Sequence, residues 1–146
     1  MTKEIIPSEL LELLTEEEIM MFQELRIRIK ELNYKTNLTR LIEGDDYWIS
    51  QVYDSLWTFK ENSNKNFDNK KFIDIGSGCG FPGFAYAITH PNSQIYLVDS
   101  SKKKTDSLKE IIKSVNFENN IFVINDRIEN LGRESKFRNS FNIATA

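Results

Sequence analysis

The sequence of 146 residues contains one cysteine and one histidine. A single cysteine excludes an intrachain disulfide, so we expect a reducing, cytoplasmic location. One histidine and one cysteine cannot supply the ligand spacing of a zinc site, and we expect no metal. Cys79 lies between two glycines, where a small side chain is needed, and no base stands near it in the sequence. These absences argue against a disulfide scaffold, a zinc site and cysteine-based catalysis.

Long apolar runs and a strong charge of one sign are missing as well. No stretch approaches the roughly 20 apolar residues that cross a bilayer, and we expect neither a secretory signal nor a membrane partner. The net charge of −3 does not indicate a nucleic-acid-binding protein, so such a role would depend on a local basic patch. The length suits one domain, or one small domain with part of another.

Glycine is scarce overall but concentrated in one place. Four of the six glycines fall within residues 76–83, directly after the apolar run of residues 72–75. Glycine accepts positive φ and lets a ligand approach the backbone closely. The apolar residues 84–88 then fit the opening of a helix. A strand, a glycine loop and a helix in this order are typical of a nucleotide-binding βαβ unit, with the ligand at the carboxyl end of the strand.

The loop is compatible with two classes of ligand. Gly78, Gly80 and Gly83 fit the dinucleotide fingerprint G-x-G-x-x-G, and Asp99 follows at the usual interval, which would indicate an NAD(P)-dependent oxidoreductase. Asp74, however, stands inside the strand two residues before the first glycine. A carboxylate is awkward in a buried strand and suits a cationic ligand such as the sulfonium of S-adenosylmethionine. We therefore favour a methyltransferase. The remaining alternative is that the glycine loop only turns the chain and binds no ligand.

The remaining segments predict a parallel sheet. Residues 94–98 form a second strand that ends in Asp99, where such folds bind ribose hydroxyls. Ser100 and Ser101 can cap the next helix within reach of the same ligand. Further strands are predicted at residues 121–124 and 141–145. Strands that alternate with helices imply right-handed crossovers and the spatial order 3-2-1-4.

Residues 1–60 predict a helical subdomain ahead of this sheet. A short helix covers residues 8–14, and Thr15 with Glu18 forms a capping box that starts a longer helix. Apolar spacing over residues 49–56 predicts another amphipathic helix. Residues 61–71 are polar and read as a linker, and residues 72–146 supply the first part of the catalytic domain. The apolar face of the longer helix comprises Phe22, Leu25, Ile29 and Leu32.

Lys102, Lys103 and Lys104 fall in the first turn of a predicted helix, the unfavourable end for cations. A phosphate partner would explain this placement, and a solvated surface run is the alternative. Arg26 and Arg28 lie off the apolar face of the longer helix, where a solvated flank is the simpler explanation. Together with Lys35 they are further candidates for contact with such a phosphate partner.

Several separated pieces of the sequence resemble the RsmG family, also called GidB, of S-adenosylmethionine-dependent methyltransferases that act on N7 of one guanine in 16S ribosomal RNA of the small subunit. The pieces are residues 74–83, 97–104, 125–129, 37–39 and 54–56, so the resemblance covers nearly the whole chain. It implies an α/β, Rossmann-like methyltransferase fold with an N-terminal helical part. It implies no catalytic side chain, because guanine N7 carries a lone pair and no proton, so direct displacement needs no base.

The resemblance also implies where the cofactor binds. Asp74 would lie near its methionine end, and Gly76 and Phe81 would contact it from the loop. The adenosine ribose would be held by the acid and serines after the second strand, and the adenine would be bordered by residues after the third. These ribose and adenine contacts are Asp99, Ser100, Ser101, Ile128 and Glu129.

Two departures from the family pattern concern function. The family often has Arg-His where this chain has Ser50 and Gln51, which affects RNA contacts there. The family also continues past Thr145 and Ala146 into an arginine and a fifth strand, so we expect a C-terminally truncated chain with an incomplete sheet and an exposed apolar sheet edge. We expect an RNA methyltransferase, and its truncation leaves open whether the chain alone is active. The alternatives are an NAD(P)-binding oxidoreductase fragment and a non-catalytic remnant that binds cofactor or RNA.

Overall fold

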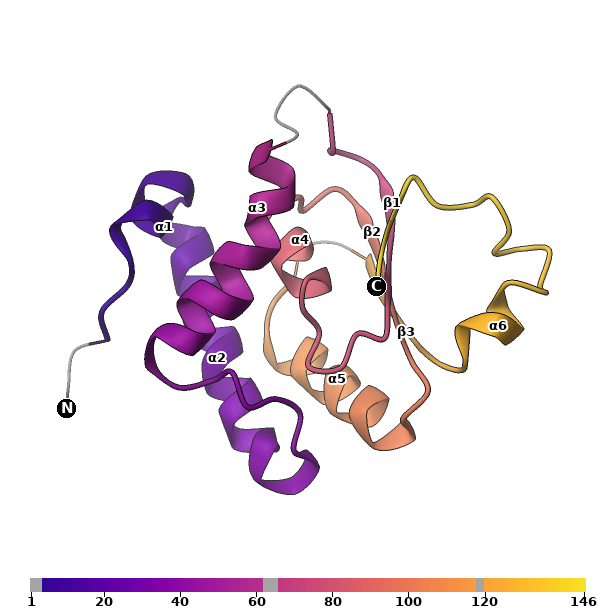
Figure 1. Cartoon of the computed structure of the whole chain (residues 1–146), viewed down its shortest axis with the longest axis horizontal. Coiled ribbons are helices and arrows are strands. Elements are labelled where there is room, and N and C mark those ends of the chain that lie inside the picture. Colours follow the sequence, from indigo (N-terminus) through magenta and orange to yellow (C-terminus); the bar gives the residue numbers. More distant parts are fainter. Residues whose placement is uncertain (1–3, 62–65, 118–119) are drawn as a thin grey trace.

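A computed structural model describes residues 4–61, 66–117 and 120–146, and residues 62–65 of the predicted linker lie outside this part (Figure 1). The helices are α1 (Ser8–Leu13), α2 (Glu16–Thr36), the π-helix η1 (Asp46–Tyr53), α3 (Asp54–Glu61), α4 (Gly83–Thr89), α5 (Lys102–Ser114) and α6 (Ile128–Leu131). The strands are β1 (Lys71–Ile75), β2 (Gln94–Asp99), β3 (Asn120–Asn125) and β4 (Ile143–Thr145).

The four strands form one parallel sheet in the order β3-β2-β1-β4, which confirms the predicted order. In the strand register, Asp74 pairs with Thr145 and Asp99 pairs with Asn125. The carboxyl ends of the strands therefore bring polar side chains from four segments to one edge of the sheet. The chain reverses its direction of winding between β1 and β4, and ligands of open α/β sheets bind at such a point.

The helices cover the two faces of the sheet unequally (Figure 1). α4 and α5 pack against the strands, and α2 packs on both of these helices. One cluster of buried side chains runs from α1 through α2 and η1 to the sheet, so the N-terminal helices and the strands share a core. On the opposite face, α6 and residues 132–142 lie over a smaller cluster around Ile73, Val98 and Leu131.

Helix α2 forms as its sequence predicts. The hydroxyl of Thr15 accepts a hydrogen bond from the backbone N–H of Glu18, whose carboxylate accepts one from the N–H of Thr15. This capping box satisfies two donors that the first helical turn leaves free. The helix ends at Asn37, which adopts a left-handed conformation with φ of 51°. The predicted apolar face is buried in full, namely Phe22, Leu25, Ile29 and Leu32.

The helix predicted over residues 49–56 differs from expectation. Its first part, η1, is a π-helix, in which each N–H bonds to the carbonyl five residues earlier. The wider turn changes which residues face the core: Tyr47 and Trp48 are fully buried, whereas Ile49 is 46% exposed. The prediction that Ile49 belongs to the apolar face was wrong, because it assumed the α-helical period.

Candidate cofactor site

The glycine loop closes over the carboxyl ends of β1 and β2. The backbone N–H groups of Gly76 and Ser77 both donate to the carbonyl of Val98, at 2.8 and 2.9 Å. The Ser77 hydroxyl donates to the carbonyl of Asp74 and accepts from the N–H of Val98. Gly76, Gly78 and Gly80 have positive φ angles of 72°, 55° and 99°. The loop is thus fixed to two strands, and glycine permits its backbone conformation.

The glycines of the loop serve two different purposes. A Cβ atom at Gly80 would lie 2.1 Å from the ring of Phe84, and one at Gly83 would lie 2.3 Å from the Leu97 side chain. These two glycines allow close packing between the loop, α4 and β2. A Cβ at Gly76 would meet no atom within 4 Å, so this glycine faces open space. The part of the loop that a ligand can approach therefore lies around Gly76.

Asp99 connects the end of β2 to the glycine loop. Its carboxylate accepts one hydrogen bond from the N–H of Gly78 at 2.9 Å and another from the N–H of Ser101 at 2.8 Å. The side chain is 9% exposed, and its residue lines a cavity. A carboxylate has about four acceptor positions, so two remain for ligand hydroxyls.

A cavity of about 270 Å³ lies beside Gly76 at the ends of β1, β2 and β3. It brings together five of the predicted cofactor residues, including both residues expected at the adenine. Asp126 and Arg127 also line it, and the prediction missed them although they belong to the same turn after β3. Its lining comprises Ile75, Gly76, Val98, Asp99, Ser100, Asp126, Arg127, Ile128 and Glu129.

Three predicted cofactor residues lie outside the lining of this cavity. Ser101 caps α5, where its hydroxyl accepts from the N–H of Lys104. Phe81 lines a second cavity, described below. Asp74 is only 2% exposed, and both of its carboxylate oxygens have partners within the chain.

Asp74 joins the loop to the edge strand. One carboxylate oxygen accepts from the N–H of Gly83 at 3.1 Å, and the other accepts from the hydroxyl of Thr145 at 3.2 Å. Burial raises the pKa of this carboxyl group to about 7, although the hydrogen bond from Gly83 opposes the shift. The acid therefore lies behind the loop, in contact with both β4 and the start of α4.

The pKa of Asp74 leads to a pH prediction. Between about pH 4 and pH 7 the folded chain holds a proton here that the unfolded chain releases, so stability should fall as the pH rises. A shift from 3.8 to about 7 corresponds to a loss on the order of 4 kcal/mol. We expect the free energy of unfolding of Asp74→Asn, measured with urea, to lack this decrease. The difference between wild type and variant at each pH isolates the contribution of Asp74 from that of other titrating groups. Equal pH slopes in both proteins would contradict the assignment.

A second cavity, of about 290 Å³, lies at the β4 end of the same edge. The loop contributes Phe81 and Pro82, whose peptide bond is cis, and Phe81 packs edge-on against Tyr47 with ring centroids 5.9 Å apart. The helical part contributes four polar side chains. The full lining is Ser50, Gln51, Asp54, Ser55, Phe81, Pro82, Thr145 and Ala146.

Gln51 attaches the helical part to the glycine loop. Its side-chain N–H group donates to the hydroxyl of Thr39 at 3.0 Å and to the sulfur of Cys79 at 3.4 Å. Burial raises the pKa of the Cys79 thiol, which agrees with the interpretation of this cysteine as a small packing residue. The position that departs from the family pattern therefore has a structural role here.

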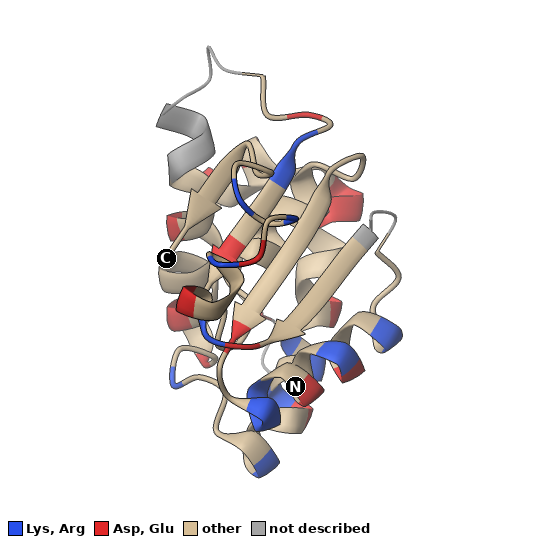
Figure 2. Cartoon of the chain, turned by 90° about the vertical axis from the view of Figure 1, so that its right-hand side faces the viewer, with Lys and Arg blue, Asp and Glu red and all other residues tan. Residues whose placement is uncertain are grey.

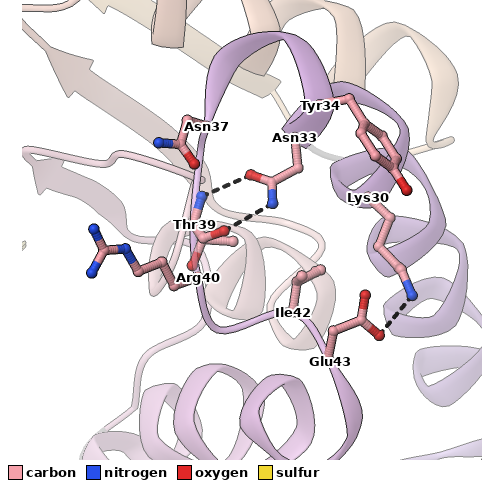
Figure 3. A pocket seen from close by; sticks show the side chains of 8 residues that line it. All are labelled: Lys30, Asn33, Tyr34, Asn37, Thr39, Arg40, Ile42 and Glu43. Atoms are coloured by element: carbon pink, nitrogen blue, oxygen red, sulfur yellow. Dashed lines mark hydrogen bonds and ion pairs between the residues drawn. The ribbon is translucent and has the colours of Figure 1, made fainter.

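A third cavity, of about 350 Å³, lies at the end of α2 and the segment that follows it (Figure 3). The Asn33 amide exchanges two hydrogen bonds with the backbone of Thr39, and Lys30 pairs with Glu43 at 2.8 Å. None of the predicted cofactor residues lines this cavity.

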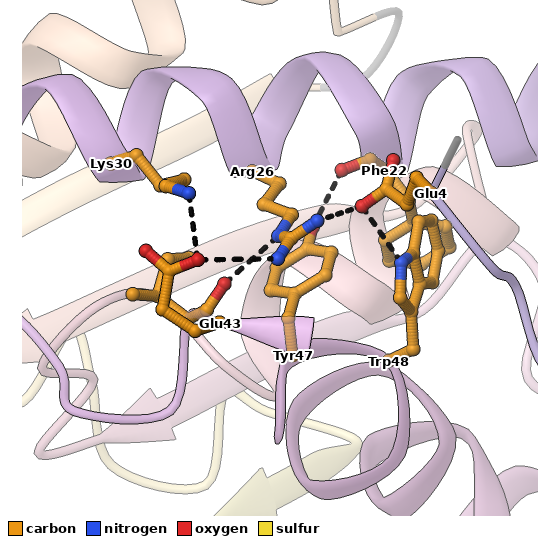
Figure 4. A network of polar contacts seen from close by, with 8 residues as sticks. Glu4, Phe22, Arg26, Lys30, Glu43, Tyr47 and Trp48 are labelled. Atoms are coloured by element: carbon orange, nitrogen blue, oxygen red, sulfur yellow. Dashed lines mark hydrogen bonds and ion pairs between the residues drawn. The ribbon is translucent and has the colours of Figure 1, made fainter. Parts of the chain in front are cut away.

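Arg26, expected on a solvated flank and named as a candidate for contact with RNA phosphates, points into the protein (Figure 4). Its guanidinium pairs with Glu4, donates to the carbonyl of Ile42 at 2.9 Å and lies 5.5 Å from the centre of the Tyr47 ring. The side chain is 13% exposed. This arginine holds the N-terminal segment and η1 against α2, so the interpretation of Arg26 as part of a solvated flank was wrong, and its guanidinium is not placed for contact with RNA.

The other candidate cations divide into paired and unpaired groups. Arg28 pairs with Glu31 at 3.0 Å, and Lys102 pairs with Asp106 at 2.6 Å. Within the described residues, the ammonium groups of Lys35, Lys103 and Lys104 have no ion pair. Figure 2 shows that α5 begins just beyond the carboxyl end of β2, so the lysines of its first turn lie near the edge of the sheet that carries the cofactor cavity.

Comparison with known proteins decides the family. The profile of GidB, described as rRNA small subunit methyltransferase G, matches residues 18–146. The chain belongs to the GidB family. Relatives named ribosomal RNA small subunit methyltransferase G are 88% identical in Prochlorococcus marinus strain MIT 9515 and 86% identical in P. marinus subsp. pastoris strain CCMP1986, each over 146 residues. A third, from strain MIT 9312, is 73% identical over 145 residues.

The chain spans 61% of the length of these GidB relatives, and the matches to the relatives from strains MIT 9515 and CCMP1986 extend over the whole chain. Membership confirms the resemblance seen in the sequence, and the parallel sheet confirms the expected α/β architecture. Among the described residues of this GidB chain, no group of histidine, cysteine and acidic side chains is placed to hold a metal ion. No helix in the described part is both long and apolar enough to cross a membrane.

Proposed function

We propose that this chain is the cofactor-binding part of a cytoplasmic methyltransferase that transfers a methyl group from S-adenosylmethionine to N7 of a guanine in 16S ribosomal RNA. The observation that carries the proposal is the hydrogen bond from Gly78 to Asp99, which fixes the acid expected to bind the ribose beside the open backbone at Gly76. Family membership and the names of the relatives support the reaction and the RNA substrate.

In this proposal the cofactor crosses the glycine loop. Asp99 accepts hydrogen bonds from the ribose hydroxyls, while Ile128 and Glu129 border the adenine in the cavity of about 270 Å³. The methionine part passes over Gly76 towards Phe81. A cation near the loop also favours ionisation of Asp74, whose pKa burial raises to about 7, since an opposite charge stabilises a carboxylate.

The reaction is a direct displacement. The guanine N7 lone pair forms a bond to the methyl carbon as the carbon–sulfur bond breaks, and that electron pair stays on sulfur to give a neutral thioether. The positive charge passes to the guanine, and no proton moves. The protein contributes by holding the two reactants in line, which can supply several kcal/mol of the barrier.

Two measurements test the proposal. Calorimetry should show that the chain binds S-adenosylmethionine and S-adenosylhomocysteine but not NAD. Labelled methyl should pass to 16S ribosomal RNA that lacks the modification, assayed with this chain and, in parallel, with the 88% identical relative from strain MIT 9515. Binding of NAD without S-adenosylmethionine would favour the oxidoreductase alternative. Cofactor binding by the chain with transfer only by the relative would identify the chain as a non-catalytic binding unit.

A further inference from the structure

The cavity at the β4 end, lined by the helical part and Phe81, is a second site along the same edge. The cofactor cavity lies at the ends of β1, β2 and β3, whereas this one is bounded by Thr145 of β4 and by the far end of the glycine loop. The two cavities therefore lie on opposite sides of the loop that would carry the methyl donor. A methyl acceptor must approach from a side that the cofactor leaves open.

Most polar groups in this second cavity already have partners. Gln51 bonds to Thr39 and Cys79, Ser55 donates to the backbone of Gln51, and Thr145 donates to Asp74. The carboxylate of Asp54 is exposed and has no hydrogen bond or ion pair with any residue that the structure describes. Among the residues that the structure describes, no lysine or arginine lines the cavity. Asp54 is thus an acceptor that a ligand with neighbouring donors can satisfy.

Guanine presents such donors. Its Watson–Crick edge carries N1–H and the 2-amino group side by side, which match the two oxygens of one carboxylate in the way that an arginine fork does. Adenine has an acceptor at N1, which a carboxylate would repel. Unpaired RNA bases are commonly read on this edge while they stack on an aromatic side chain. The N7 atom lies on the other side of the guanine ring, away from the Watson–Crick edge.

We propose that Asp54 determines the specificity for guanine: its carboxylate accepts hydrogen bonds from N1–H and the 2-amino group, while N7 faces the glycine loop. This inference rests on the proposed methyltransferase function and adds the acceptor site to it. Phe81 and Pro82 supply an apolar surface for the base, and the buried Tyr47 packs edge-on against the Phe81 ring. The volume of about 290 Å³ suits a single base, at the lower end of ligand cavities.

The test compares guanosine and inosine 5′-monophosphates, which differ only in the 2-amino group. We expect the chain with bound S-adenosylhomocysteine to bind the guanosine nucleotide about tenfold more tightly, the effect of one hydrogen bond to a charged group. Asp54→Asn should reduce the preference to less than about twofold. Asp45→Asn, an equal charge change at an exposed residue outside the cavity, should retain it. NMR titration should show the largest shifts at the amides of Ser50 and Phe81.

The outcomes separate this inference from the proposed function. Calorimetry of S-adenosylhomocysteine on wild type and Asp54→Asn should give equal affinities, because Asp54 does not line the cofactor cavity. Equal affinities would also show that the variant is folded. An unchanged guanosine-to-inosine ratio in Asp54→Asn, or no preference in wild type, would overturn the role of Asp54. Absence of S-adenosylhomocysteine binding in wild type would instead overturn the methyltransferase proposal.

Discussion

Replacement of Gly80 by alanine should lower the free energy of unfolding by roughly 2–5 kcal/mol, the sum of two costs. The first is backbone strain, because φ at this position is +99°. The second is overpacking, because the new methyl group would lie 2.1 Å from the ring of Phe84. That ring is fully buried and stacks on Phe117 with centroids 5.4 Å apart, so it has little room to move. Urea unfolding followed by tryptophan fluorescence measures the change.

Gly44→Ala is the matched control for this experiment. Gly44 also has a positive φ, of 49°, but an added Cβ would meet no atom within 4 Å. This variant should therefore lose only the strain contribution, about 1–2 kcal/mol. If both variants lose the same amount, the close packing of the loop against α4 does not contribute to stability as we infer.

Asp99→Ala should weaken the binding of S-adenosylmethionine by about 100-fold or more. The variant removes the acceptors for the ribose, and hydrogen bonds to charged groups contribute about 1.5–3 kcal/mol each. It also removes the partner of the Gly78 N–H, so the loop beside the ligand loses one of its attachments. Titration calorimetry at constant pH gives the dissociation constants.

Asp106→Ala is the corresponding control. Asp106 lies on α5 and pairs with Lys102 in solvent, and it does not line the cofactor cavity. The variant changes the net charge by the same amount and should keep the wild-type affinity. An Asp99→Ala protein that binds as tightly as Asp106→Ala would show that the cofactor does not use this acid.

Local patterns in the sequence were sufficient for the architecture. The capping box at Thr15 and the apolar spacing of α2 depend on residues within a few positions of one another, and both are confirmed. The order of the strands follows from their alternation with helices, which restricts the possible topologies. The placement of Asp99 beside the loop follows from the same rules, because parallel strands end at a common edge.

Features that depend on contacts between distant residues were not accessible in this way. The π-helix has no residue signature, so the exposure of Ile49 could not be anticipated. Arg26 lies one position after the buried Leu25, and only the folded arrangement of Glu4 and Tyr47 shows that it points inward. The predicted roles of individual residues in cofactor binding remain predictions, since spacing places residues near a site but does not establish which atoms touch a ligand.

The shared partner of the loop and the edge strand has a further consequence. The Asp74 carboxyl group accepts hydrogen bonds from both the Gly83 amide and the Thr145 hydroxyl. Detachment of β4 and loosening of the loop are therefore thermodynamically linked. A ligand that stabilises the loop should therefore slow hydrogen exchange at the amides of residues 143–145. Because linkage is reciprocal, a polypeptide segment that pairs with β4 should raise the affinity of the loop for that ligand. The exchange rates of the β4 amides would then report whether a ligand occupies the loop.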